Sequence, residues 1–285
     1  MHVTLRRAVV GATALAVATG CGVVTMSPAT AATPGQSNAT AQSLQVSLGG
    51  QSAYASDVAQ AHNTGSGPTV KNSTDTTPSQ PLPGVGVGVL AATAVANPDG
   101  TSYACAGLVA PGGQVSVGSD SSQCTITGPR RGGVTVNLGG SLAPVPGVGF
   151  ILLKMNAISA HAAMEGRTRT GTVRIDGALL EICAGRSSGT RCGGQVVDVP
   201  LTIRGTRGED VTPALLDSLT HTSQLGALGA TLSAALRPVL SITTNIRGTN
   251  SANAFQITAM SIKIGGGSAA DFELATATAG PNRSR

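Results

Sequence analysis

The chain has 285 residues, of which 41% are hydrophobic, 11% charged and 2% aromatic, and its formal net charge is +5. This length and apolar content suit one large or two small globular domains. With two tyrosines, three phenylalanines and no tryptophan, the chain has almost no aromatic platform for stacking bases, so its basic excess does not indicate nucleic-acid binding.

Residues 1–31 have the three parts of a cleavable export signal. Arg6-Arg7 gives a positive start, residues 8–24 are uncharged and mostly apolar, and the run ending at Ala31 has small residues where signal peptidase requires them. We expect cleavage after Ala31, with cleavage after Ala32 as the second choice. Removal of this segment lowers the net charge to +3, because it contains two arginines and no acidic residue.

Two other export routes stay open as alternatives. Cys21 follows Ala18-Thr19-Gly20, an arrangement related to a lipoprotein signal, although Ala18 stands where an aliphatic residue is usual. The twin arginines followed by Val9-Val10 are related to a Tat signal. A permanent anchor fits less well, because a spanning helix needs about 20 strongly apolar residues and this segment is rich in Ala, Gly and Thr. We therefore expect no stable membrane span after cleavage.

Residues 43–141 are predicted to form an N-terminal β region that follows a flexible lead-in over residues 32–42. Residues 60–83 are mostly Ser, Thr, Asn, Gly and Pro, which predicts a disordered surface loop, because such a segment buries too little apolar surface to offset its ordering entropy. The sequence Asn97-Pro98-Asp99-Gly100 predicts a tight turn. Alternating apolar residues predict strands at 44–48, 85–95, 101–109, 115–117, 125–127 and 134–138.

Residues 142–280 are predicted to form a C-terminal β region, and residues 281–285 a tail. A Pro/Gly connector over residues 142–149 marks a boundary between two β layers or subdomains. Pro200 cannot donate a ladder hydrogen bond, which places its strand at a sheet edge. Strands are predicted at 158–164, 173–175, 180–182, 197–203, 240–246, 255–264 and 272–274.

One Leu-rich helix is predicted near residues 212–237. Thr212 can cap it, Pro213 occupies the favoured first position, and leucines recur near helical spacing. Gly226 and Gly229 weaken its middle and would split it into two. The many short strands and this one helix predict a mainly β fold, an antiparallel β-sandwich built as one unit or as two β layers or subdomains.

The signal segment leaves four cysteines in the chain, Cys105, Cys124, Cys183 and Cys192. An even number of cysteines in an exported chain indicates disulfide bonds, which persist in oxidising compartments. Three pairings are open, and nearest-neighbour pairing, Cys105–Cys124 with Cys183–Cys192, is the simplest. Each bond would contribute about 3 kcal/mol through loop-closure entropy. A zinc site is disfavoured, because neither spacing is C-x-x-C and histidines are few.

Three runs of the sequence resemble a known group of proteins: GTSYACAGLV at 100–109, NAFQI at 253–257 and ADFELATATAG at 270–280. The group consists of exported, mostly actinobacterial surface proteins described as the "choice-of-anchor" family, and the resemblance spans most of residues 85–280. It implies a strand-rich fold and no catalytic residues. Such proteins usually carry a C-terminal anchor. Because this chain ends without an LPxTG-like motif or an apolar tail, we expect release or non-covalent retention.

Two short motifs invite a catalytic or metal-binding interpretation. The run Gly185-Arg-Ser-Ser-Gly189 matches the G-x-S-x-G pattern that places a nucleophilic serine, here Ser187, on a strand-to-helix turn. No helix is predicted after it, so a disulfide-closed surface hairpin is favoured. His161 and Glu165 are four residues apart, which would suit a helical metal site, but the segment is predicted to be a strand and both are expected to face solvent.

Paired carboxylates could support glycoside hydrolysis. Nothing in the sequence distinguishes one pair among the candidates, which are Asp176, Glu181, Asp198, Glu209, Asp210, Asp217, Asp271 and Glu273.

The sequence therefore predicts a non-enzymatic, secreted or cell-surface β-protein with a structural or adhesive role, without catalytic, metal or cofactor residues. The alternative is an extracellular binding module for a glycan or envelope component, and a secreted hydrolase is the least favoured hypothesis. Expected partners are cell-envelope components or other surface proteins. Nucleic acid is not expected among them.

Overall fold

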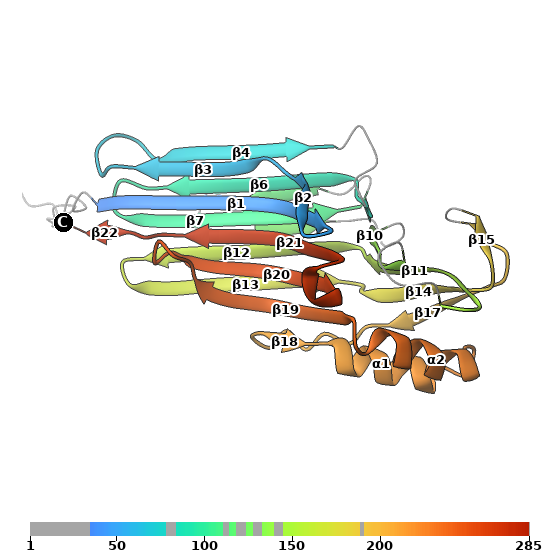
Figure 1. Cartoon of the computed structure of the whole chain (residues 1–285). Helices are drawn as coiled ribbons and strands as arrows, with labels where there is room; N and C mark the ends of the chain where they lie inside the picture. The colour runs from blue at the N-terminus through green and yellow to red at the C-terminus, as the bar shows by residue number, and fades with distance from the viewer. Residues whose placement is uncertain are drawn as a thin grey trace, which may run out of the picture. The chain divides into compact units, whose positions relative to one another are not determined.

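The computed structural model describes residues 35–77, 84–110, 114–117, 124–127, 133–139, 145–188 and 191–284. The expected export signal, with Cys21, Ala31 and Ala32, lies outside these residues. The described chain is mainly β and forms an antiparallel sandwich with two helices (Figure 1). The fold class predicted from the alternating apolar residues is confirmed.

The largest sheet, here called the long sheet, has eight strands: β1 (Gly35–Leu48), β2 (Gln51–Ala55), β3 (Val58–Asn63), β18 (Glu209–Asp210), β19 (Leu240–Thr249), β20 (Phe255–Ile264), β21 (Ala270–Ala279) and β22 (Arg283–Ser284). Their order is β18-β19-β20-β21-β1-β2, and β3 and β22 also pair with β1. The first half of β1 therefore lies between β3 and the C-terminal strand β21 (Figure 1).

A five-stranded sheet, here called the central sheet, packs face to face against the long sheet. It contains β4 (Val70–Thr76), β6 (Val89–Ala96), β7 (Thr101–Val109), β12 (Ala157–Glu165) and β13 (Thr168–Asp176), in the order β13-β12-β7-β6-β4. Its strands β6 and β7 lie against β1, and β7 and β12 lie against β21. Buried alanines face one another across this interface, among them Ala41, Ala106 and Ala277. Such small side chains let the two sheets approach closely.

A second five-stranded sheet, here called the end sheet, extends the central one. It contains β5 (Val85–Gly86), β10 (Val134–Asn137), β11 (Val148–Met155), β14 (Leu179–Ala184) and β17 (Gln195–Pro200), in the order β17-β14-β11-β10-β5. Only Asn156 separates β11 from β12. Pro200 lies in the edge strand β17, as predicted from its missing N–H.

Two helices, α1 (Thr212–His221) and α2 (Ala227–Leu236), replace the single helix predicted over 212–237. The break falls at Thr222–Gly226, and Gly226 has a φ of 51°. The predicted splitting by glycine is therefore confirmed. Helix α1 contacts β17 and β19, and the helix leucines join the same core as the strands. No helix of the described chain is long and apolar enough to cross a membrane.

Two small hairpins complete the fold. They consist of β8 (Gln114–Val117) with β9 (Cys124–Thr127), and of β15 (Ser187–Ser188) with β16 (Arg191–Cys192). A 3-10 turn, η2 (Gly265–Gly267), joins β20 to β21. The predicted turn at residues 97–100 joins β6 to β7, where Asp99 Oδ1 accepts hydrogen bonds from the Thr101 N–H and hydroxyl.

In four neighbouring strands of the long sheet, the alternation between inward and outward side chains shifts by one residue at the same level of the sheet. The four residues at this level form a row. The row consists of Asn245, Ala259, Ala275 and Ser43. None of the four has a partner in the antiparallel registers that join β19, β20, β21 and β1. On one side of the row the inward residues of β21 are odd-numbered, and on the other side they are even-numbered. Two of the four, Asn245 and Ala275, have positive φ angles of 50° and 56°. In β20 the buried apolar residues change from the odd positions Phe255 and Ile257 to the even positions Met260, Ile262 and Ile264 at this row, so the change is part of a bend that four strands share.

Two predictions for the N-terminal region are wrong. Residues 35–42 of the expected flexible lead-in belong to β1, where Ala39 and Ala41 are buried. The expected loop over 60–83 contains the end of β3 and all of β4, while residues 78–83 lie outside the described chain. Strand β4 is polar because it is an edge strand that pairs with β6 through its backbone, which needs no apolar side chains.

The predicted division at residues 141 and 142 is not a boundary in the fold. Strand β7 pairs with β12, and β1 pairs with β21, so segments from both predicted regions share the same sheets. The described residues, from Gly35 to Ser284, belong to one compact unit. In the expected tail, β22 pairs with Gly35 and Gln36 of β1.

Candidate functional site

One side of the sandwich is formed by the edges of two sheets that no strand of the described chain links. Strand β13 is the edge of the central sheet, and β19 lies at the facing edge of the long sheet. The short strand β18 pairs only with Thr243 and Thr244, so residues 245–249 of β19 have no strand partner on that side among the described elements. This side is here called the open side.

Alternate residues of the two edge strands face the gap between the sheets. In β13, Arg169, Val173 and Ile175 pair with buried, inward residues of β12. In β19, Arg247 and Thr249 pair with buried, inward residues of β20. Because cross-strand partners share a face, two arginines occupy positions that elsewhere in these sheets hold core residues.

Strand β13 approaches the long sheet most closely at Gly171. A Cβ atom at this position would lie 1.9 Å from Ile257 Cδ1 and 2.7 Å from the carbonyl oxygen of His161. Only glycine fits this contact without movement of its neighbours. Gly171 therefore sets the spacing of the two edges that carry Arg169 and Arg247.

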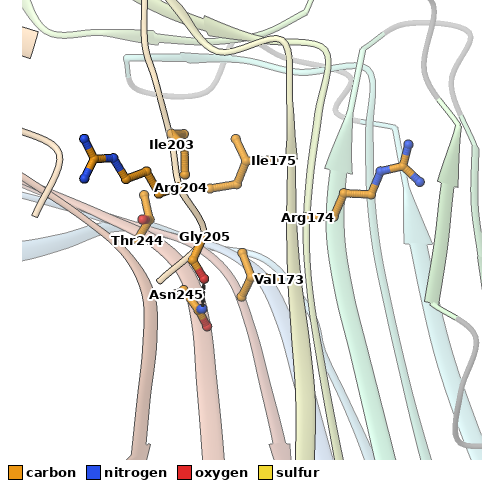
Figure 2. Close-up of a pocket in the computed structure, with 8 residues that line it drawn as sticks. All are labelled: Val173, Arg174, Ile175, Ile203, Arg204, Gly205, Thr244 and Asn245. Carbon is orange, nitrogen blue, oxygen red and sulfur yellow. Dashed lines mark hydrogen bonds between the residues drawn. The ribbon is translucent and has the colours of Figure 1, made fainter. Parts of the chain in front are cut away.

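A groove of about 230 Å³ lies at one end of the open side (Figure 2). Its apolar wall consists of Val173, Ile175 and Ile203, which lie near one another, and Figure 2 shows the Arg174 and Arg204 guanidinium groups pointing away from it. It is lined by Val173, Arg174 and Ile175 of β13, Ile203, Arg204 and Gly205 of the segment before β18, and Thr244 and Asn245 of β19.

Asn245 connects the groove to the arginines. It is buried and has a φ of 50°, a conformation that asparagine tolerates better than most residues. Its Nδ2 donates a hydrogen bond of 2.7 Å to the carbonyl oxygen of Gly205 (Figure 2), and its Oδ1 accepts one of 2.8 Å from Nε of Arg247. One side chain thus fixes both the groove wall and the direction of an arginine.

The segment before β18 presents two further arginines on a fixed turn. Both carboxylate oxygens of Glu209 accept hydrogen bonds from the Arg204 N–H, and one also accepts from the Thr206 N–H. The guanidinium group of Arg207 donates a 3.1 Å hydrogen bond to the carbonyl oxygen of Arg247. The turn is therefore tied to β19, and Arg204 and Arg207 are exposed.

Arg169 bridges the two sheets. Nη1 of Arg169 in β13 donates a 3.0 Å hydrogen bond to Oγ1 of Thr249 in β19. These groups form what is here called the open-side seam: Arg169, Val173, Ile175, Ile203, Arg204, Arg207, Asn245 and Arg247. Within the described chain, none of its four arginines forms an ion pair, whereas Arg174 is neutralised by Asp176 at 3.0 Å.

This seam was hard to predict from the sequence, because its residues lie on three separate segments. The only local signal was an arginine at an inward position of a strand, as Arg169 is relative to Val173. Burial of such a charge costs free energy unless the charge reaches water or a partner. An inward-facing arginine therefore indicates the edge of a core rather than its middle.

Ser187 of the G-x-S-x-G motif lies in the β15–β16 hairpin rather than on a strand-to-helix turn. Its hydroxyl donates a 2.7 Å hydrogen bond to the carbonyl oxygen of Gly149. No hydrogen bond within the described residues joins it to a histidine or carboxylate. The predicted disulfide-closed hairpin is confirmed.

His161 does not face solvent as predicted, whereas Glu165 is exposed. His161 lies on the face of β12 turned away from the long sheet, beside Cys105 of β7, and it is 6% exposed. The β8–β9 hairpin lies against β7 and β12, and it adds cover that the strand pattern did not reveal. Burial lowers the pKa of His161, and its Nε2 has no hydrogen-bond partner among the described groups.

The eight candidate carboxylates are dispersed among separate structural roles. Most of them hold local structure, as Glu209 does in its turn. The other contacts are Asp176 with Arg174, Glu181 with Lys154, Asp217 with His221, Asp271 with Lys263, and Asp210 with the Thr212 N–H, while Asp198 is exposed beside Glu181 in the neighbouring strand.

Asp271 and Glu273 also lie close together, on the same face of β21. Burial raises the pKa of Glu273, the charge of Asp271 raises it further, and Lys263 opposes this. Asp271 Oδ1 has no hydrogen-bond partner among the described groups. The two carboxylates lie side by side along one strand, and neither lines the open-side groove. They therefore do not form the facing pair that glycoside hydrolysis uses.

Both predicted disulfides are present, Cys105–Cys124 and Cys183–Cys192, with Cα–Cα distances of 5.8 Å and 5.5 Å. The first attaches the β8–β9 hairpin to the central sheet, and the second joins Cys192 of the β15–β16 hairpin to Cys183 of β14. Disulfides indicate an oxidising environment. No group of three metal-binding side chains occurs in the part of the chain described.

Neither a protein-family model, a curated protein nor a solved structure matches this chain.

Proposed function

We propose that this protein is exported and acts outside the cytoplasm, without catalysis, as a structural or adhesive β-sandwich that holds a cell-envelope component. The observation that carries the proposal is the pair of disulfides in one compact β unit. Cys105 and Cys183 are fully buried and their partners Cys124 and Cys192 are partly exposed, so each bond ties a surface hairpin to a strand of the core. Such bonds persist where thiols are not kept reduced.

The open-side seam supports a binding role. The side chains of three of its four arginines are held by hydrogen bonds to neutral groups, and its groove offers an apolar wall beside them. A surface that combines orienting polar groups with an apolar recess is suited to recognition. Because a rigid sandwich pre-positions these groups, binding requires little ordering of the protein.

The experiment is fractionation of the producing cells, followed by detection of the chain in the cytoplasm, the envelope and the medium. We expect a processed chain in the medium or the envelope, with both disulfides oxidised when free thiols are counted under denaturing conditions. Detection of the protein only in the cytoplasm, with four reactive thiols in the processed region, contradicts the proposal.

The second candidate is a soluble extracellular binding module for a glycan or another surface protein, and the groove beside Ile203 favours it. The two candidates differ in where the protein stays. A structural or adhesive protein stays with washed envelopes, whereas a soluble module is recovered from the medium and binds added envelope fragments reversibly.

A further inference from the structure

We propose that the open-side seam binds a linear anionic polymer whose repeat units carry phosphodiester or carboxylate groups and no bases. This inference rests on the proposed function, because it names the chemistry of the envelope component that the protein holds. The seam brings together cationic groups from three segments of the chain, namely Arg169, residues 204–207 and Arg247.

The hydrogen bonds of these arginines leave their charge available. Arg169 donates to a threonine hydroxyl, Arg207 to a backbone carbonyl and Arg247 to the Asn245 amide oxygen, so each is positioned by a neutral acceptor. A guanidinium group has five N–H donors in a fixed fork. Most of the donors therefore remain for a ligand, and a fork of this kind binds the paired oxygens of a phosphate or carboxylate.

The positions of the groups favour an extended ligand over a single small anion. Arg247 and Thr249, the acceptor for Arg169, lie two residues apart on one face of β19, which corresponds to about 7 Å along the strand. Arg207 attaches to the same strand through the carbonyl of Arg247. The cationic groups thus follow an edge strand, and a polymer with one charge in each repeat unit can contact several at once.

The lining of the groove argues for a polymer without bases. Val173, Ile175 and Ile203 are aliphatic, and no aromatic side chain lines the groove. Single-stranded nucleic acids are usually held by stacking of bases on aromatic rings. An aliphatic wall suits instead the C–H faces of a polyol or sugar backbone.

Within the described chain, no acid forms an ion pair with a seam arginine, and the seam keeps an excess of positive charge because its four arginines outnumber the one nearby carboxylate that has no cationic partner, Glu209. Glu209 is occupied by the backbone N–H groups of Arg204 and Thr206, and Asp176 is paired with Arg174 on the far side of β13. Arg169 and Arg207 are exposed, and Arg247 is partly exposed, so a ligand can reach all three.

The test measures equilibrium binding of the oxidised, processed chain to poly(glycerol phosphate), polygalacturonate, a neutral glucan and a single-stranded oligonucleotide. We expect binding to one or both anionic polymers, little binding to the glucan, and an affinity that falls as salt is raised. The two anionic polymers distinguish phosphodiester from carboxylate recognition. The combined variant Arg169→Gln, Arg207→Gln and Arg247→Gln should lower affinity about tenfold or more, since charge-assisted bonds are the strong ones.

Two further variants separate site binding from general charge. The control Lys71→Gln, Arg186→Gln and Arg191→Gln removes the same charge from exposed positions elsewhere and should change affinity less than about twofold. The variant with Lys in place of Arg169, Arg207 and Arg247 keeps the charge but loses the fork, and it should fall between the wild type and the Gln variant. Circular dichroism and thermal unfolding check that each variant is folded.

Three results overturn the inference: equal losses in the seam and control variants, binding of the oligonucleotide as tight as that of the polymers, or no polymer binding by the folded wild type at low salt. Failure of the proposed function looks different, because it appears as a cytoplasmic chain with reduced cysteines. Retention on envelopes without polymer binding refutes the ligand and leaves the adhesive role standing.

Discussion

The two sides of the sandwich are closed in different ways. On the β3–β4 side, a short connection joins the edge strands of the two sheets, and Asn63 holds it through hydrogen bonds to Pro68, Ala96 and Gly65. On the β13–β19 side no strand of the described chain crosses, and the edges meet through Gly171 and the arginine contacts of the seam.

This difference shows how one fold separates stability from recognition. The β3–β4 side is built from residues that are close in sequence. Ala59 and Ala61 of β3 are buried on its inner face. The β13–β19 side is built from residues far apart in sequence and carries charge at positions where a core would otherwise continue. We therefore expect substitutions on the first side to change stability alone, and substitutions on the second to change stability and binding.

The largest change in stability should come from removal of the Cys105–Cys124 disulfide, which lies on neither of these two sides. Replacing Cys105 and Cys124 together with Ala should lower the free energy of unfolding by about 3 kcal/mol, through loss of loop-closure entropy. Polymer binding should stay within about twofold, because this bond holds the β8–β9 hairpin on the face of the central sheet away from the seam. Urea unfolding and binding titrations measure the two quantities, and a large loss of binding would show that the hairpin supports the seam.

Gly171→Val should push apart the two sheet edges of the β13–β19 side. Its side chain would overlap Ile257 and the backbone of β12, and overpacking of this kind costs about 1–3 kcal/mol. Gly248→Val in the facing strand β19 is the matched control, since a Cβ at Gly248 meets nothing within 4 Å. The comparison fails if both variants unfold at the same urea concentration as the wild type.

A pair of asparagine variants separates the sides by function. Asn63→Ala and Asn245→Gly should each cost about 2 kcal/mol, because each removes a buried amide and leaves backbone partners unsatisfied. Glycine is chosen at 245 because it accepts the positive φ. Only Asn245→Gly should also weaken polymer binding, since Arg247 then loses the acceptor that orients it. Equal binding by both variants would contradict this assignment.

The smallest change in stability should come from substitution of His161, which lies on β12, an inner strand of the central sheet rather than an edge strand. Burial lowers its pKa below the ordinary value of 6.5, so below about pH 6.5 the unfolded chain binds more protons at this group than the folded chain. Stability should therefore fall as pH drops below that value, and His161→Gln should reduce the fall. Thermal unfolding between pH 7.5 and about 4.5 measures it; parallel curves for the two proteins would show that His161 is not responsible.

Much of the fold could be predicted from local patterns. The alternation of apolar residues predicts most strands, and the loss of an N–H at Pro200 predicts an edge strand. The disulfide pairing followed from short separations, and the helical region from leucine spacing. Each of these depends on chemistry within a few residues or on one short loop.

The failed predictions share a physical cause. Strands β3 and β4 carry polar side chains, so hydrophobic patterning could not reveal them, and their order comes from backbone pairing with β1 and β6. His161 was predicted to be exposed because it alternates with the apolar residues of its strand. The β8–β9 hairpin, from elsewhere in the chain, lies against that strand and covers it. Both errors arise because the environment of a strand face depends on what packs against it.

The sequence by itself determined the strand-rich class, the turn at residues 97–100 and the helical region, because these depend on local periodicity and backbone preference. It favoured nearest-neighbour cysteine pairing among three open pairings, and the structure decided for it. Tertiary structure alone decided that β1 lies against β21, that four strands bend along one row, and that Arg169, Arg207 and Arg247 meet at one edge. Contacts between distant segments depend on sheet order and register, and the side-chain pattern of a single strand shows which of its faces is buried without identifying the strand that lies beside it.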